Sequence, residues 1–146
     1  MDTRGPLHSL SVGHEKIDAD HNRMLEAIDR LMRVAGGGNK AACEREFDNL
    51  IALTWEHFAF EEKLMVQHRY PDIDCHQKEH AKLVDELILL KAYCDDGSMS
   101  IPDNMRDALH RWMTKHIQEC DKPLANHILL TDGGVRTTPG FVASRG

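Results

Sequence analysis

A histidine and a glutamate, His57 and Glu61, stand four residues apart within a long, largely apolar stretch. Four residues are about one helical turn, so in a helix both side chains project from the same face. The same face carries Phe47, Leu50, Ile51, Thr54, Leu64 and Met65. A face of this composition points toward a core, where an ionised glutamate is costly without a cationic partner. The pair therefore predicts a buried metal site in a helical protein.

Four helical segments follow from apolar positions that recur at helical spacing. They run from about Asp18 to Ala35, from Lys40 to Gln67, from Asp72 to Tyr93 and from Ser100 to Cys120. Pro123 is expected to interrupt or kink the last helix, which leaves residues 124–130 as a short terminal turn. Four helices joined by short connections predict an all-α fold, an up-down-up-down antiparallel four-helix bundle.

The length of the chain, 146 residues, suits one domain with a hydrophobic core. We expect this domain to span residues 1–130. Residues 1–16 contain Gly5, Pro6 and Gly13 and are expected to form an irregular N-terminal arm. Residues 131–146 are expected to form a flexible tail.

The charge of the chain argues against two classes of partner. The formal net charge is −6 and no basic cluster is present, so neither nucleic acid nor an anionic membrane is expected as a partner. The N-terminal stretch does not resemble a signal peptide, and the longest apolar run, Leu87 to Leu90, is far too short to span a bilayer. These features predict a cytoplasmic protein.

The cysteines are widely spaced and form no Cys-x-x-Cys pair. They are Cys43, Cys75, Cys94 and Cys120. In a reducing compartment they are expected to be free thiols, each packed as a small buried hydrophobe. Cys75 and Cys120 stand out only because each is adjacent to a candidate metal ligand.

Residues of the types that bind metals recur on every predicted helix. The candidates are His21, His57, Glu61, His76, His80, His116 and Asp121. His76 and His80 repeat the one-turn spacing of the first pair, so they can share one metal ion. His116 and Asp121 are five residues apart and diverge by about 140° on a regular α-helix, so they converge only if the helix loosens near Pro123. In an antiparallel bundle all seven side chains fall at one end.

Each candidate taken alone has a structural explanation. His21 fits a hydrogen-bonded core histidine, and Asp121 fits a charge at a helix end. The pair at 57 and 61 fits an intrahelical contact, and His76 with His80 fits a surface patch. Their conjunction at one level of the bundle favours a metal site. The remaining histidines are expected to be surface or packing residues: His8, His14, His68, His110 and His127.

The donor set narrows the choice of metal. Carboxylates and imidazoles suit divalent iron, manganese or zinc. Seven ligands are too many for one tetrahedral zinc but fit two metal ions bridged by both carboxylates. Ferritin-like di-iron proteins use Glu-x-x-His motifs, and this chain contains none.

The spacing of the candidates resembles that of a known family, the hemerythrins, in particular their single-domain bacterial type. The resemblance runs from about Val12 to Leu130. The matching motifs are Gly13-x-x-x-Ile17-Asp18-x-x-His21, His57-Phe58-x-x-Glu61-Glu62-x-x-Met65, His76-x-x-x-His80 and Trp112-x-x-x-His116-Ile117-x-x-x-Asp121. The chain departs from the family at Pro6, near which a tryptophan is usual, and at His14, where an apolar residue is usual.

The resemblance implies a non-haem di-iron centre with an oxo or hydroxo bridge. His76, His80 and His116 would bind one iron and His21 and His57 the other, with Glu61 and Asp121 bridging both. The iron with two histidines would keep an open position for dioxygen. Leu25, Phe60, Trp112 and Ile117, each within a turn of a ligand, are candidates for the wall of a dry pocket.

Three functional hypotheses follow from the resemblance and the ligand set. The leading one is reversible dioxygen binding for oxygen storage, delivery or sensing, which makes the chain an oxygen-binding protein and not an enzyme. The absence of a fused signalling domain favours a free carrier, and a sensor would need a further protein partner. An alternative is a di-iron peroxidase or an enzyme that scavenges nitric oxide or peroxide. The third is a metal-free helical interaction protein.

Overall fold

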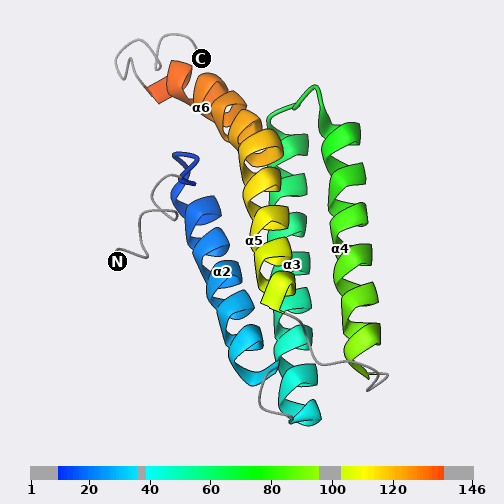
Figure 1. Cartoon of the computed structure of the whole chain (residues 1–146). Coiled ribbons are helices and arrows are strands. Elements are labelled where there is room, and N and C mark those ends of the chain that lie inside the picture. Colours follow the sequence, from blue (N-terminus) through cyan, green and yellow to red (C-terminus); the bar gives the residue numbers. More distant parts are fainter. Residues whose placement is uncertain (1–9, 36–38, 96–102, 137–146) are drawn as a thin grey trace.

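The computed structural model describes residues 10–35, 39–95 and 103–136, and all regular structure in these ranges is helical. The helices are α2 (Glu15–Ala35), α3 (Lys40–Gln67), α4 (Ile73–Asp95), α5 (Asp103–His116) and α6 (Lys122–Arg136). Helices α2 and α4 run in one direction and α3 and α5 in the other (Figure 1). The predicted up-down-up-down four-helix bundle is confirmed. No helix in the described part of the chain is long and apolar enough to cross a membrane.

Local hydrogen bonds set where the first two helices begin. Helix α3 begins after Asn39, whose side chain accepts the backbone N–H of Ala42 at 3.0 Å and so acts as its N-cap. Helix α2 begins at Glu15, three residues earlier than expected, and His14 Nδ1 accepts the backbone N–H of Ile17 at 3.3 Å. His14 thus stabilises the first turn of α2. Pro6 and His8 lie outside the described residues.

The C-terminal part of the chain differs from the expected break at Pro123. A π-helical turn (Ile117–Asp121) follows α5 directly, and α6 continues from Lys122 to Arg136. Pro123 is the second residue of α6, directly after the π-helical turn, and the chain is helical on both sides of it. Residues 131–136, which were expected to begin the C-terminal tail, belong to α6 and are helical. Residues 137–146 and the predicted cap at Ser100 lie outside the described part.

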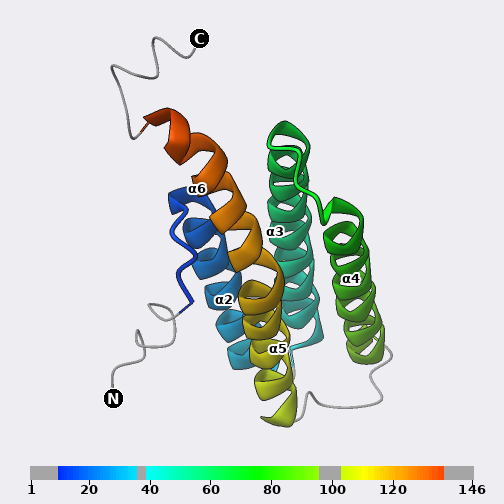
Figure 2. The same ribbon diagram turned by 90° about the horizontal axis from the view of Figure 1, so that it is seen from above.

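Helix α6 continues the course of α5 and leans toward the beginning of α2 (Figures 1 and 2). Two histidines expected to be surface or packing residues hold it in place. His127 Nε2–H donates to the backbone carbonyl of His68 at 2.7 Å, and His68 Nδ1 lies 2.8 Å from Thr131 Oγ1. These bonds tie α6 to the turn between α3 and α4.

The interior divides into an apolar part and a polar part. The main apolar cluster includes Ile28, Leu31, Phe47, Leu50, Leu87 and Leu109, and a second cluster comprises Met65, Tyr70, Leu124 and Ile128. In the described part of the chain, nine buried residues are polar, namely Asp20, His21, Thr54, His57, Glu61, His76, His80, His116 and Asp121. So many buried ionisable groups require mutual pairing or a bound cation.

The cysteines behave differently from one another. Cys43 is buried, as expected of a small hydrophobe. Cys75 is exposed on α4 and Cys120 is half-buried, so the expectation of burial is wrong for both, and both carry free thiols. The side chain of Cys94 lies outside the described residues.

Candidate metal centre

The structure brings all seven candidate ligands together from every helix of the bundle. Each is at least nine-tenths buried. One group of mutually close ligand atoms comprises Glu61, His76, His80, His116 and Asp121, and a second comprises His21, His57, Glu61 and Asp121. Within each group the ligand atoms lie within 4.8 Å of one another. The carboxylates of Glu61 and Asp121 therefore belong to both groups. The first group has three histidines, and the second group has two.

Glu61 lies at the centre of three imidazoles from two helices. The Nε2 of His57 is 2.9 Å from one carboxylate oxygen of Glu61. The Nε2 atoms of His80 and His76 lie 3.0 Å and 3.3 Å from the other. The carboxylate thus spans both groups of ligands.

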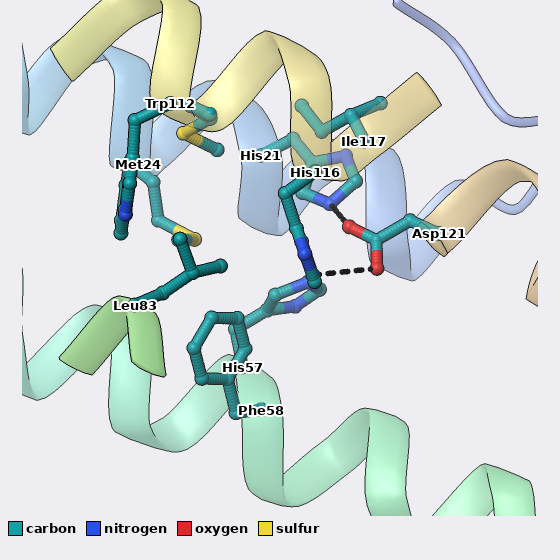
Figure 3. Close-up of a pocket in the computed structure, with 10 residues that line it drawn as sticks. His21, Met24, His57, Phe58, Leu83, Trp112, His116, Ile117 and Asp121 are labelled. Atoms are coloured by element: carbon teal, nitrogen blue, oxygen red, sulfur yellow. Dashed lines mark hydrogen bonds and ion pairs between the residues drawn. The ribbon is translucent and has the colours of Figure 1, made fainter. Parts of the chain in front are cut away.

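Asp121 has an equivalent set of neighbours on the other side of the centre. The Nε2 of His21 lies 2.8 Å from Oδ2, and the Nε2 atoms of His76 and His116 each lie 3.1 Å from Oδ1. Figure 3 shows Asp121 contacting both His21 and His116. All five histidines therefore present Nε2 to the two carboxylates.

The π-helical turn makes the pairing of His116 with Asp121 possible. A regular α-helix aligns residues four apart, whereas the i→i+5 bonding of a π turn brings residues five apart onto one face. The backbone N–H of Lys122 bonds to the carbonyl of Ile117 and closes this turn. The predicted loosening is thus present, but it lies over residues 117–121, before Pro123.

The pKa values of the histidines reflect the two carboxylates. Burial disfavours the charged imidazolium, but Glu61 outweighs it and raises the pKa of His57 to about 9. By the same competition, hydrogen bonds to Asp121 and Glu61 raise the pKa of His76 to about 9. Burial likewise opposes protonation of His116, but Asp121 raises its pKa to about 10. Without a metal ion, protons therefore supply the positive charge that this cluster needs.

The carboxylates show the reciprocal effect. Burial and the nearby Asp121 both oppose ionisation of Glu61, yet His57 lowers its pKa to about 2. Burial also opposes ionisation of Asp121, but the contact with His116 lowers its pKa well below the ordinary range. Two ionised carboxylates thus lie in a nearly water-free interior, which suits divalent cations.

The donor atoms also fit a pair of metal ions. Among the described residues, three inward-facing atoms lie at ion-pair distance from a partner but make no hydrogen bond: His57 Nε2, Glu61 Oε2 and His116 Nε2. Buried polar atoms are rarely left unpaired, because each costs about 1–3 kcal/mol. Imidazole nitrogen and carboxylate oxygen are ligands for divalent iron, manganese and zinc. The residues therefore fit two such ions, with the carboxylates between them.

Sequence reasoning assigns no role to two further carboxylates at this site. Asp20 Oδ2 lies 2.8 Å from His57 Nδ1, and Glu62 Oε2 lies 2.9 Å from His80 Nδ1. An acceptor on the outer nitrogen fixes the orientation of an imidazole and makes Nε2 the ligating atom. The sequence signals are that Asp20 precedes His21, and that Glu62 follows Glu61 and belongs to the matching motif His57-Phe58-x-x-Glu61-Glu62-x-x-Met65.

Asp20 is also held in place by two cations. Lys16 Nζ lies 2.6 Å from Asp20 Oδ1, and Arg23 contacts the same oxygen. Burial opposes ionisation of Asp20, but the bond to His57 and then Lys16 lower its pKa well below the ordinary range. Asp20 is therefore an ionised acceptor that orients His57 from α2.

Replacing Asp20 with asparagine is expected to lower the metal affinity of the centre about 10- to 100-fold, because His57 loses its charged acceptor. The measurement is the metal retained by the protein against a graded series of chelators. Asp18→Asn is the matched control, since Asp18 bonds only to the nearby chain at Ser11 Oγ and Val12 N. Equal retention in the Asp20 and Asp18 variants would contradict the orienting role.

A small apolar cavity adjoins the ligands. Its volume is about 10 Å³, and its lining residues are His21, Met24, His57, Phe58, Leu83, Trp112, Met113, His116, Ile117 and Asp121. Met24, Leu83 and Trp112 lie on the side away from Asp121 (Figure 3). A cavity of this size holds about one water-sized molecule.

The lining partly matches the expected wall. Trp112 and Ile117 line the cavity as predicted, but Leu25 and Phe60 do not. Leu25 is buried in the main apolar cluster, and the ring of Phe60 lies against His14 and beneath Lys16 at 5.2 Å.

Phe58 was not among the expected wall residues. Its ring stacks on the ring of His80, with centroids 3.7 Å apart and planes 7° from parallel. It thus holds a candidate ligand in place and walls the cavity at the same time.

Comparisons with known proteins point to one family. The family model named Hemerythrin HHE cation binding domain matches residues 12–130. The chain is 29% identical to a bacteriohemerythrin of Stenotrophomonas maltophilia, over 82% of this chain and 77% of that protein. It is 30% identical to a bacteriohemerythrin of Pseudomonas aeruginosa, over 77% of this chain and 72% of that protein. A solved structure of wild-type hemerythrin is similar with a TM-score of 0.71, at 25% identity over 78% of this chain and 88% of that one.

Proposed function

Because this chain belongs to the hemerythrin family, we propose that it binds dioxygen reversibly at a di-iron centre, for oxygen storage, delivery or sensing. The observation that carries the proposal is the position of the cavity. It contacts both histidines of the group with two, His21 and His57, but only His116 of the group with three. A small ligand in the cavity would thus lie beside the metal position with fewer protein ligands.

The residues divide into roles as follows. His76, His80 and His116 would hold one iron, His21 and His57 would hold the other, and Glu61 and Asp121 would serve both. The two groups of mutually close ligand atoms support this division, because only the carboxylates occur in both. When bound, a pair of ferrous ions supplies two electrons for reversible binding of dioxygen.

The protein's own contribution is to keep water away from that ligand. Met24, Leu83 and Met113 give the cavity an apolar wall. Burial of the ligands beneath this wall limits proton access and so slows irreversible oxidation of the centre. Asp20 and Glu62 fix the orientation of two imidazoles from outside.

Trp112 lines both the cavity and a solvent-open groove, as do Leu83 and His116, and its indole is the largest of the three side chains there. Trp112→Ala is expected to admit water and to raise the rate of irreversible oxidation severalfold, measured as decay of the oxygen adduct in air. Trp55→Ala is the matched control, because the Trp55 side chain is 55% exposed on α3 and does not line the cavity. Equal decay rates in the two variants would contradict this role for Trp112.

The deciding experiment is the visible spectrum of reduced, iron-loaded protein before and after exposure to air. A ligand-to-metal charge-transfer band that appears in air and is lost on removal of oxygen would support a carrier or sensor. A band that persists after oxygen removal would indicate irreversible oxidation and contradict the proposal. Purified protein with negligible iron after expression in iron-rich medium would contradict any di-iron function.

One observation favours the enzymatic alternative, a di-iron peroxidase or a scavenger of nitric oxide or peroxide. The groove of about 190 Å³ reaches His116 from solvent and gives an electron donor a place to approach the centre. Steady turnover of hydrogen peroxide with an added electron donor would support this alternative. A single stoichiometric reaction without turnover would contradict it.

A further inference from the structure

A second cluster of metal-binding residue types lies outside the buried centre. Glu79 on α4, His116 at the end of α5 and Cys120 in the π-helical turn each offer one ligand atom, and the three atoms lie within 4.8 Å of one another. Glu79 and Cys120 are half-buried, whereas His116 is buried. Glu79 and Cys120 take no part in the proposed di-iron centre.

These residues lie at a solvent-open groove between α4 and α5. Its volume is about 190 Å³, and its lining residues are Glu79, Lys82, Leu83, Glu86, Trp112, Lys115, His116, Glu119 and Cys120. A metal ion can therefore reach the cluster directly from solvent. The groove also has room for a water molecule beside a bound ion.

The outer nitrogen of His116 is buried beside two further groups that can bind a metal. Nδ1 of His21, His76 and His116 each lacks a hydrogen-bond partner in the described structure, but only His116 has Glu79 and Cys120 close to it. Its Nε2 faces Asp121, so Nδ1 is directed away from the di-iron position. A buried nitrogen of this kind is costly unless an acceptor or a cation occupies the space beside it.

We infer that Glu79, His116 and Cys120 form a peripheral site for a thiophilic divalent cation such as Zn²⁺, which adjoins the di-iron centre and shares His116 with it. One thiolate, one imidazole and one carboxylate, with a fourth position open to water, are typical of zinc and not of magnesium or calcium. Tetrahedral zinc ligands lie about 3.3–3.8 Å apart, so the side chains need to close by only about 1 Å.

The peripheral site and the di-iron centre share His116. An imidazole bound to metals through both nitrogens must lose both ring protons, which is unfavourable at neutral pH. The two sites therefore compete for this residue, and the peripheral site fills most readily in iron-free protein. The inference does not depend on dioxygen binding, and it stands or falls separately from the proposed function.

The test is a titration of iron-free protein with Co²⁺, a spectroscopic substitute for Zn²⁺, followed by the thiolate-to-cobalt charge-transfer absorption. Wild-type protein is expected to develop this band, and Zn²⁺ is expected to displace it. Cys120→Ser is expected to abolish the band, and Glu79→Gln to raise the dissociation constant for Co²⁺ at least about tenfold. Cys75→Ser is the matched control, because Cys75 is an exposed thiol beside His76 and should leave the band unchanged.

A second variant separates the peripheral site from the buried centre. His57→Ala removes a proposed iron ligand that lies outside the cluster, so the cobalt–thiolate band is expected to persist in it. Absence of the band in wild-type protein, or its persistence in Cys120→Ser, would overturn the inference. Loss of the band in His57→Ala protein that retains wild-type helix content would also overturn it, since the site would then depend on a ligand outside the cluster.

Discussion

Replacing Glu61 with alanine is expected to empty both metal positions and to abolish the oxygen adduct. Glu61 Oε1 and Oε2 approach imidazoles of both ligand groups, so the substitution removes one donor from each metal. It also removes one of the two ionised carboxylates that face both groups of ligands. Iron per chain, by elemental analysis, and the visible spectrum in air are the measurements.

His57→Ala should act on one side of the centre. The Nε2 of His57 contacts Glu61 and belongs only to the group with two histidines. The variant is therefore expected to retain at most about one iron per chain and to form no oxygen adduct, because the position beside the cavity has lost a ligand.

Glu56→Ala provides the control for both variants. Glu56 is exposed on the same helix, directly before His57, and takes no part in the ligand groups. Its iron content and spectrum are expected to equal those of the wild type. Unchanged iron stoichiometry and spectrum in both the Glu61 and His57 variants would refute the ligand assignment.

The bundle and the convergence of the seven side chains could be predicted from sequence because burial and helical spacing coincide. His57 and Glu61 lie on the apolar face of α3. The helical spacing of the apolar residues predicts both the helix and the burial of these two side chains. Antiparallel order then places the end of α3 beside the start of α4. Once the topology is known, the level of each candidate along the bundle is determined.

The orienting carboxylates and the cavity wall could not be predicted in this way. Whether Asp20 reaches His57 depends on how α2 is rotated and how far it stands from α3, and neither is encoded in the period of a single helix. The same rotation places Met24, and not Leu25, against the cavity. Packing between helices determines which residues orient the ligands and which line the cavity.

The π-helical turn explains the largest error in the predicted fold. Pro123 indicates a helix end when only α-helical hydrogen bonding is considered. The wider turn before it changes the register, so the proline falls at the start of α6 and the helix continues. The five-residue spacing of His116 and Asp121 was the sequence signal for a π-helical turn. This turn lies directly before Pro123, where the helix continues.

Stability of the iron-free protein is expected to fall as the pH rises from about 6.5 through 9 to 10. The pKa values of His57 and His76 are raised to about 9 and that of His116 to about 10. A group with a raised pKa in the folded state stabilises the fold fully below its unfolded value of about 6.5 and loses that contribution above its folded value. The measurement is the melting temperature of iron-free protein across this range.

Below about pH 4.5, the stability of the iron-free protein is expected to change with pH in the opposite direction and to fall as the pH falls. The pKa of Glu61 is lowered to about 2, so its contribution is complete above its unfolded value near 4.5 and is lost as the pH falls toward about 2. Iron-free protein is therefore expected to be most stable between about pH 4.5 and 6.5. His110→Ala should keep this profile, because His110 pairs with Asp29 away from the centre.

Iron loading should reverse the alkaline decline. Metal ions displace the protons of the histidine cluster, so iron affinity rises with pH over the range in which the iron-free fold weakens. Free iron about 1,000-fold above its dissociation constant stabilises the folded state by about 4 kcal/mol, which raises the melting temperature of a chain of this size by about 10 to 20 °C. The difference between loaded and iron-free protein should therefore be larger at pH 8 than at pH 6. A difference that shrinks as the pH rises would mean that protons and iron do not share the same imidazoles.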